Sequence, residues 1–149
     1  IRRGRVDCFH SAHTPVTSSV AHGPRAGRAV GVPAVDLLLP LLMSAVKHGR
    51  LNMERLVAMC CEGPAALFGL ENKGRIEVGY DADLVFLREG ESLRLRNAPE
   101  PVGAGWTPFL NREVGLLPQI VIAGGKIVAR SGLLSDELQP GKALVAHRG

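Results

Sequence analysis

A short apolar pattern gives way to a polar loop in the stretch Val6-Asp7-Cys8-Phe9-His10-Ser11-Ala12-His13-Thr14-Pro15-Val16-Thr17. The alternation at its start predicts the end of a β-strand, and the His, Ser, Thr and Pro residues that follow predict a loop. In α/β barrels, the loops at the carboxyl ends of the strands carry the functional side chains. The stretch therefore predicts an α/β fold, with His10 and His13 among the first candidate functional residues.

Four residues of this stretch match a family motif: Ser11, His13, Pro15 and Thr17. They resemble the signature Ser-Asp-His-Ala-Pro-His-Thr at the end of the eighth barrel strand in dihydroorotases and related cyclic amidohydrolases. Ala12 stands where the signature has Asp, and Val16 stands where it has the second His. The resemblance implies an enzyme whose two Zn²⁺ ions activate a hydroxide, with the Asp as metal ligand and proton carrier. An alanine methyl can do neither, so we expect no catalytic residue here.

A second candidate segment, Gly31-Val32-Pro33-Ala34-Val35-Asp36, ends the long irregular loop of residues 18–33. It resembles the Gly-x-Pro-Gly-x-Glu pattern that ends the substrate-covering loop of the same family. Ala34 replaces a glycine whose lack of a Cβ lets the backbone approach a ligand closely. The resemblance implies a degenerate substrate site, with candidates Ala12, His13, Val16, Pro33 and Ala34. The alternative for the loop is an ordinary surface connection.

The two histidines of the first stretch form a His-x-x-His pair, and neutral imidazoles can bind Zn²⁺. His10 precedes the usual ligand position, and His13 matches a family residue other than the usual metal ligand. We therefore expect no metal site and no cofactor in this chain. His10 and His13 are weak candidates beside the zinc that the resemblance implies for the family.

Residues 73–85 carry the second family resemblance, in the sequence Lys73-Gly74-Arg75-Ile76-Glu77-Val78-Gly79-Tyr80-Asp81-Ala82-Asp83-Leu84-Val85. Amidohydrolases of this superfamily have Lys-Gly-x-Ile-x-x-Gly-x-Asp-Ala-Asp-Leu-Val where the chain leaves the barrel for a small β-sandwich. Asp and Gly are turn formers whose conformations suit such a crossing. We therefore expect structural roles for Asp81 and Asp83 and disfavour a catalytic carboxylate pair.

The apolar period changes from helical to strand-like near Leu70. Residues 36–68 are predicted to be mainly helical, with Gly49 ending the first helix, Asn52 capping the second and Pro64 starting a third that Gly69 closes. Residues 75–130 are predicted to be mainly strand and loop. The expected strands are 84–87 and 93–95, then 119–123 and 126–130 joined by a two-residue hairpin at Gly124-Gly125. Residues 96–118 are expected to be mostly irregular, anchored by 106–109, and residues 131–149 to form a loose tail.

Composition excludes several classes of protein. The net charge is +4 and aromatic residues make up 4%, which disfavours a nucleic-acid-binding face. No run of about 18 apolar residues predicts a membrane span. Three cysteines, two of them adjacent, give no disulfide framework and favour a reducing, cytoplasmic setting. The chain begins at Ile1 rather than Met, so we expect a piece of a longer product.

We expect the C-terminal part of a TIM-barrel amidohydrolase: residues 1–70 the end of the barrel, residues 71–130 part of a small β-sandwich, and residues 131–149 a tail. Such a piece would expose apolar surface, so we expect it to depend on the rest of the barrel or on a homo-oligomer. The resemblance implies two alternatives for function. One is a catalytically inactive dihydroorotase homologue of pyrimidine biosynthesis, a pseudoenzyme that is a structural partner of aspartate transcarbamoylase. The other is an active Zn-dependent cyclic amidohydrolase with an altered site.

Overall fold

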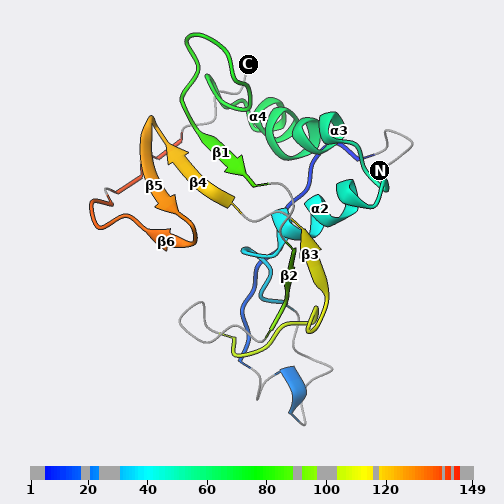
Figure 1. Ribbon diagram of the computed structural model, residues 1–149. Coiled ribbons are helices and arrows are strands. Elements are labelled where there is room, and N and C mark those ends of the chain that lie inside the picture. Colours follow the sequence, from blue (N-terminus) through cyan, green and yellow to red (C-terminus); the bar gives the residue numbers. More distant parts are fainter. Residues whose placement is uncertain are drawn as a thin grey trace.

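The computed structural model describes residues 6–17, 21–23, 31–88, 92–96, 104–115, 118–138, 140–141 and 143–144. Figure 1 shows the labelled helices grouped together, with a four-stranded sheet beside them and a smaller two-stranded sheet below. The predicted change from helix to strand is confirmed, because every described helix longer than one turn precedes Leu70 and every named strand follows it. In the part of the chain that the structure describes, no helix is long and apolar enough to cross a membrane.

Helix α2 spans Leu38–Lys47 and ends before Gly49, as predicted. Pro40 is the third residue of this helix, where a missing N–H removes no bond within the helix. The helix packs against the strand β3, Glu113–Gly115. Lys47, in its last turn, places a favourable positive charge at the negative end of the helix dipole.

The core lies where α2 meets the second helical segment. Met43 is fully buried and packs with the buried Leu51 and Leu56. Several partly buried residues surround this cluster: Leu39, Leu42, Ala45, Val46, Cys60 and Leu87. Met59 and Val114 are also fully buried. Helix α2 therefore supplies the largest share of this core.

The second and third predicted helices form one continuous element. It consists of α3 (Met53–Val57), the π-helical turn η2 (Ala58–Glu62) and α4 (Gly63–Leu67). The cap is confirmed, because the Asn52 side chain accepts a hydrogen bond of 2.9 Å from the Arg55 N–H. The predicted start of a separate third helix at Pro64 is wrong, because the element continues through it.

The π turn explains why Pro64 does not break the helix. The Gly63 N–H donates to the Ala58 carbonyl, five residues back. If this spacing of five residues continues, the Met59 carbonyl is the one that would accept an N–H from residue 64. Pro64 has no N–H to donate to it. The Phe9 N–H, from outside the helix, donates to the Met59 carbonyl at 3.1 Å. A distant segment thus supplies the donor that proline lacks.

Residues 6–10 dock on this helix instead of forming the predicted strand end. The described residues before α2 contain one isolated parallel bridge, between His13 and Val32, and no longer strand. A Cβ on Gly63 would lie 2.3 Å from the Asp7 carbonyl oxygen, so only glycine permits the close approach. The strand prediction was wrong because a strand needs neighbouring strands to pair with, and here the backbone bonds to a helix.

The larger sheet has the order β1-β4-β5-β6 with antiparallel pairs. Its strands are β1 (Leu84–Leu87), β4 (Pro118–Ala123), β5 (Lys126–Arg130) and β6 (Leu133–Leu134). The predicted hairpin is confirmed, because Ala123 pairs with Lys126 across Gly124-Gly125. The smaller sheet pairs β2 (Ser92–Arg94) with β3. Strand β3 lies in the segment predicted to be mostly irregular and was not predicted itself. Strand β6 lies in the predicted loose tail, and that expectation is corrected.

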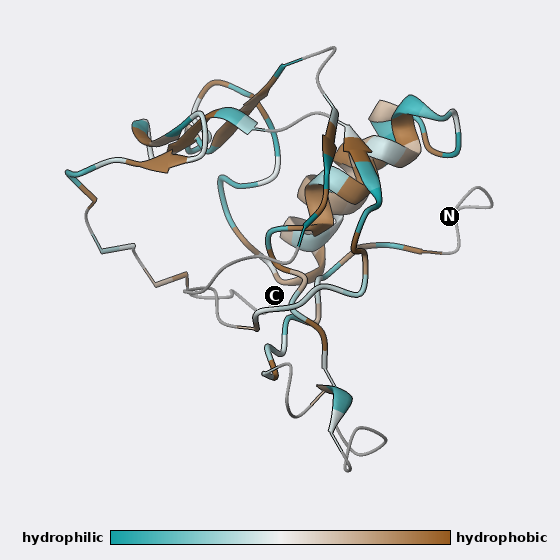
Figure 2. Cartoon of the chain, turned by 60° about the horizontal axis from the view of Figure 1, so that its bottom comes forward, coloured by the Kyte–Doolittle hydropathy of each residue, from teal (hydrophilic) through white to brown (hydrophobic). Residues whose placement is uncertain are grey.

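Apolar side chains remain exposed on both sheets and at the end of the helical element. Figure 2 shows apolar colour along the strands of the larger sheet. The more exposed apolar residues of β1, β5 and β6 are Val85, Phe86, Ile127, Leu133 and Leu134. At the end of α4, Leu67 and Phe68 are also exposed. Surface of this kind is typical of faces that another part of a protein covers.

Candidate functional site

Ala12 occupies a tight turn in the left-handed backbone region, with φ of +47°. The turn is fixed by local hydrogen bonds: the Ala12 N–H donates to His10 Nδ1 at 3.0 Å, and the Thr14 hydroxyl donates to the Ala12 carbonyl at 3.3 Å. Asn, Asp and Gly favour this region, whereas alanine has no side-chain group to stabilise it. The backbone at position 12 therefore has a conformation that suits the aspartate of the family signature better than alanine.

The structure brings the two predicted site segments together. The Thr14 N–H donates to the Val32 carbonyl at 3.2 Å. A Cβ on Gly31 would lie 2.5 Å from Thr14 Cβ, so the approach requires glycine. His13 Nδ1 lies 3.1 Å from the N–H nitrogens of both Ala34 and Val35. Of the predicted site residues, His13 and Ala34 are therefore in direct contact.

Val16 and Pro33 both lie near Trp106. Trp106 Nε1 donates to the Val16 carbonyl at 2.8 Å, so the predicted anchor at 106–109 holds the first stretch in place. A hollow of about 30 Å³ lies beside it, lined by Pro33, Asp36, Leu37, Arg96, Ala104, Trp106 and Thr107. That volume admits one or two water molecules and not a substrate ring. Thr107 belongs to the predicted anchor, whereas no sequence motif distinguishes Arg96.

The donor set in residues 10–16 does not fit the zinc centre that the resemblance implies. His10 and His13 each use Nδ1 as the acceptor of backbone N–H groups, which places the ring proton on Nε2. Metal binding through Nε2 would require the other tautomer and would break these hydrogen bonds. Among the residues that the structure describes, no three His, Cys, Asp or Glu side chains are grouped so that they could hold a metal ion.

The adjacent cysteines are not activated nucleophiles. Burial raises the pKa of the Cys60 thiol, and the neighbouring Cys61 raises it further. Burial also raises the pKa of Cys61, with Glu62 as the second cause. A thiol whose pKa is raised carries less thiolate at neutral pH. Cys60 packs against the core and has the role of a small apolar residue.

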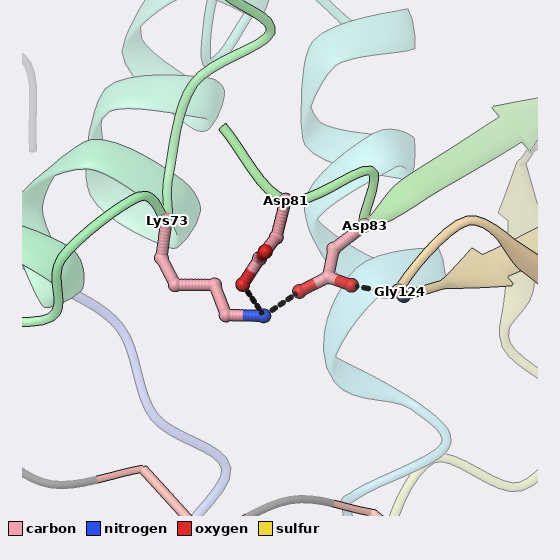
Figure 3. Close-up of polar contacts among 4 residues, drawn as sticks. All are labelled: Lys73, Asp81, Asp83 and Gly124. Atoms are coloured by element: carbon pink, nitrogen blue, oxygen red, sulfur yellow. Dashed lines mark hydrogen bonds and ion pairs between the residues drawn. The ribbon is translucent and has the colours of Figure 1, made fainter. Parts of the chain in front are cut away.

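Lys73 ties together the residues of the second family motif (Figure 3). Its Nζ lies 2.9 Å from Asp81 Oδ2 and 2.5 Å from Asp83 Oδ2. The other oxygen of Asp83 accepts the Gly124 N–H at 2.7 Å. The Gly125 N–H also donates, at 3.0 Å, to the Ala82 carbonyl. The motif therefore connects the end of the helical part to the β4–β5 hairpin, which supports a structural role for both aspartates.

Charge within this cluster shifts two pKa values in opposite directions. The hydrogen bond from Lys73, and then that from the Gly124 N–H, hold the pKa of Asp83 below its usual value. The carboxylates of Asp83 and then Asp81 raise the pKa of Lys73. The stability that Asp83 contributes is therefore complete above its ordinary pKa, about 3.9, and is lost as pH falls through its lowered value. The stability that Lys73 contributes is lost only as pH rises through the raised pKa of Lys73.

Asp83→Asn is expected to reduce the free energy of unfolding at pH 7 by about 1 kcal/mol, within the range of partly exposed ion pairs. The difference from the unsubstituted protein should shrink as the pH falls from 4 towards 2.5. Urea unfolding at several pH values measures this difference in the free energy of unfolding. Glu62→Gln is the control, since Glu62 lies 3.5 Å from Arg75 in an exposed pair and should contribute close to nothing. Equal losses in both variants, or a loss independent of pH, would contradict the role of Asp83.

Comparison with known proteins gives the family. Residues 27–128 match the model of the amidohydrolase family. A dihydroorotase of Halobacterium salinarum is 34% identical over 125 residues, which are 84% of this chain and 29% of that protein. An L-hydantoinase of Paenarthrobacter aurescens is 34% identical over 104 residues, covering 68% of this chain and 23% of that protein.

Solved structures agree with the sequence relatives. A D-hydantoinase (dihydropyrimidinase) from Thermus sp. superimposes with a TM-score of 0.81 and 28% identity, over 91% of this chain and 31% of that one. This chain thus spans less than a third of the length of these proteins. The fold class expected from the sequence, a partial α/β structure of the barrel amidohydrolases, is confirmed. The chain belongs to the amidohydrolase family, as a member similar to dihydroorotases and hydantoinases.

Proposed function

We propose that the protein is a dihydroorotase-like homologue of pyrimidine biosynthesis that has lost catalysis and acts in the cytoplasm as a structural partner of aspartate transcarbamoylase. The observation that carries the proposal is Ala12. It lies in a backbone conformation that aspartate favours, at the position where the family signature has its carboxylate. Loss of a general base alone typically lowers the rate by about 10²- to 10⁴-fold.

The surroundings of Ala12 support the loss of catalysis. Val16 takes the place of the second histidine of the signature. The Val16 carbonyl is held by Trp106, so the segment is ordered although its two chemically active positions are replaced. His13 is used by backbone donors. His10 is likewise used, as acceptor of the Ala12 N–H, so neither imidazole is free to take over the role of the aspartate.

A specific observation favours the alternative, an active Zn-dependent cyclic amidohydrolase with an altered site. The two site segments make a close contact that requires Gly31 beside Thr14, so they are still assembled against each other. In that case catalysis would use residues outside this chain. The upstream sequence discriminates the two: an intact His-x-His on the first barrel strand and a metal-bridging Lys favour the enzyme.

Co-purification tests the partnership. Full-length protein should form a stable complex with aspartate transcarbamoylase by size-exclusion chromatography. Ala12→Asp should leave that complex unchanged, because the proposed association depends on surfaces outside the site. Full-length protein that elutes alone at every concentration tested would remove the scaffold role.

A further inference from the structure

We propose that His13 is a positioning residue whose Nδ1 caps the turn that leads into α2, and so fixes residues 31–35 against the Ala12 segment. The evidence is a pair of hydrogen bonds of 3.1 Å from consecutive backbone N–H groups, those of Ala34 and Val35. Two donors that converge on one ring nitrogen define the position of the loop more closely than a single bond does. This role does not depend on whether the protein hydrolyses anything.

The turn before α2 needs such an acceptor. The Ala34 carbonyl accepts the N–H groups of Leu37 and Leu38, both at 3.2 Å, so the turn continues into the helix. The N–H groups at its start have no acceptor within the helix. Leu37, the residue before the helix, provides no side-chain cap. His13 provides the acceptor from 21 and 22 residues away in the sequence.

The chemistry of the ring agrees with this role. Since Nδ1 accepts two hydrogen bonds, the imidazole is neutral and carries its proton on Nε2. The amino end of a helix has a partial positive charge, which an acceptor such as Nδ1 complements. The same bonds keep Nδ1 from binding a metal ion.

The backbone around His13 holds the ring in place. The His13 N–H donates to Ser11 Oγ at 3.3 Å, and His13 forms the isolated parallel bridge with Val32. The side chain thus extends this contact from the bridge to the turn at residues 34–37.

Three variants of the full-length protein test the proposal at pH 8: His13→Asn, His13→Gln and His13→Ala. The carbonyl oxygen of Asn is as far from the backbone as Nδ1, whereas that of Gln is at the distance of Nε2. Hydrogen–deuterium exchange is measured for overlapping peptides across residues 31–37. We expect near-normal protection in the Asn variant and about tenfold faster exchange in the Gln and Ala variants, since two hydrogen bonds are lost.

Peptides from residues 42–47 of α2 are the internal reference, because faster exchange there would indicate a general loss of structure. Equal exchange in the Asn and Gln variants, whether slow or fast, would overturn the proposal, since it would show that the position of the acceptor is immaterial. A second measurement needs no folded variant. Histidine ¹⁵N spectra of the unsubstituted protein should show an unprotonated Nδ1 at His13. A protonated Nδ1 there would also overturn the proposal.

Discussion

Ala12→Asp combined with Val16→His is expected to raise dihydroorotate hydrolysis by about 10²- to 10⁴-fold in full-length protein that has kept its other metal ligands. The backbone at position 12 is ready for the change, because its φ of +47° is more favourable for Asp than for Ala. The new carboxylate restores a metal ligand and proton carrier, and the new imidazole restores a substrate-binding group. The hydrolysis rate with and without added Zn²⁺ measures the effect.

Ala12→Asn with Val16→His is the matched control. Asn has the shape of Asp and the same preference for the left-handed region, but its amide cannot accept and return a proton. It should therefore stay close to the rate of the unsubstituted protein. If the Asp variant binds stoichiometric zinc and remains inactive, the assignment of position 12 is wrong. If it binds no zinc, the upstream ligands have also been lost, as expected of a chain that serves only as a scaffold.

Met43→Ala is expected to lower the free energy of unfolding by about 2–5 kcal/mol. Met43 has no exposed surface and packs with Leu51 and Leu56 where α2 meets the second helical element. Truncation would leave a cavity that surrounding side chains fill only in part. Urea unfolding of the full-length protein, or pulse proteolysis if unfolding is irreversible, gives the change.

Met53→Ala is the control, because the residue type is the same and Met53 is 41% exposed at the start of α3. Met53→Ala should change the free energy of unfolding by no more than about 0.5 kcal/mol, as substitutions at surface positions do. Similar losses in the two variants would mean that the contact of α2 with the second helical element is not the core of this part of the molecule.

The features that were predicted correctly are those with local causes. Asn52 caps its helix through the N–H three residues ahead, and Gly124-Gly125 turns between two apolar runs. Both depend on residues within a few positions of each other, so their patterns could be recognised.

The features that were missed depend on distant partners. Strand β6 has two residues and exists because β5 lies beside it, and β3 pairs with β2 across an irregular segment. Pro64 stays within a continuous helix because the Phe9 N–H reaches the Met59 carbonyl. No local pattern encodes such contacts, so propensity alone predicted a break, a tail and an irregular loop.

The candidate site shows the same division. The replacements at Ala12 and Val16 could be recognised in the sequence, because the surrounding frame resembles the family signature. The hydrogen bonds from Ala34 and Val35 to His13 could not. They involve backbone N–H groups, which every residue but proline has, and they join positions more than 20 residues apart.

The proposals above depend on loss of the amidohydrolase reaction at the position of Ala12. Turnover of dihydroorotate by unsubstituted full-length protein, purified without chelator and supplied with Zn²⁺, tests it most directly. The account predicts no rate above that of buffer, because no carboxylate is present at this position to carry the proton. Robust turnover that is abolished by a chelator would contradict it and would identify the protein as an active enzyme with an altered site.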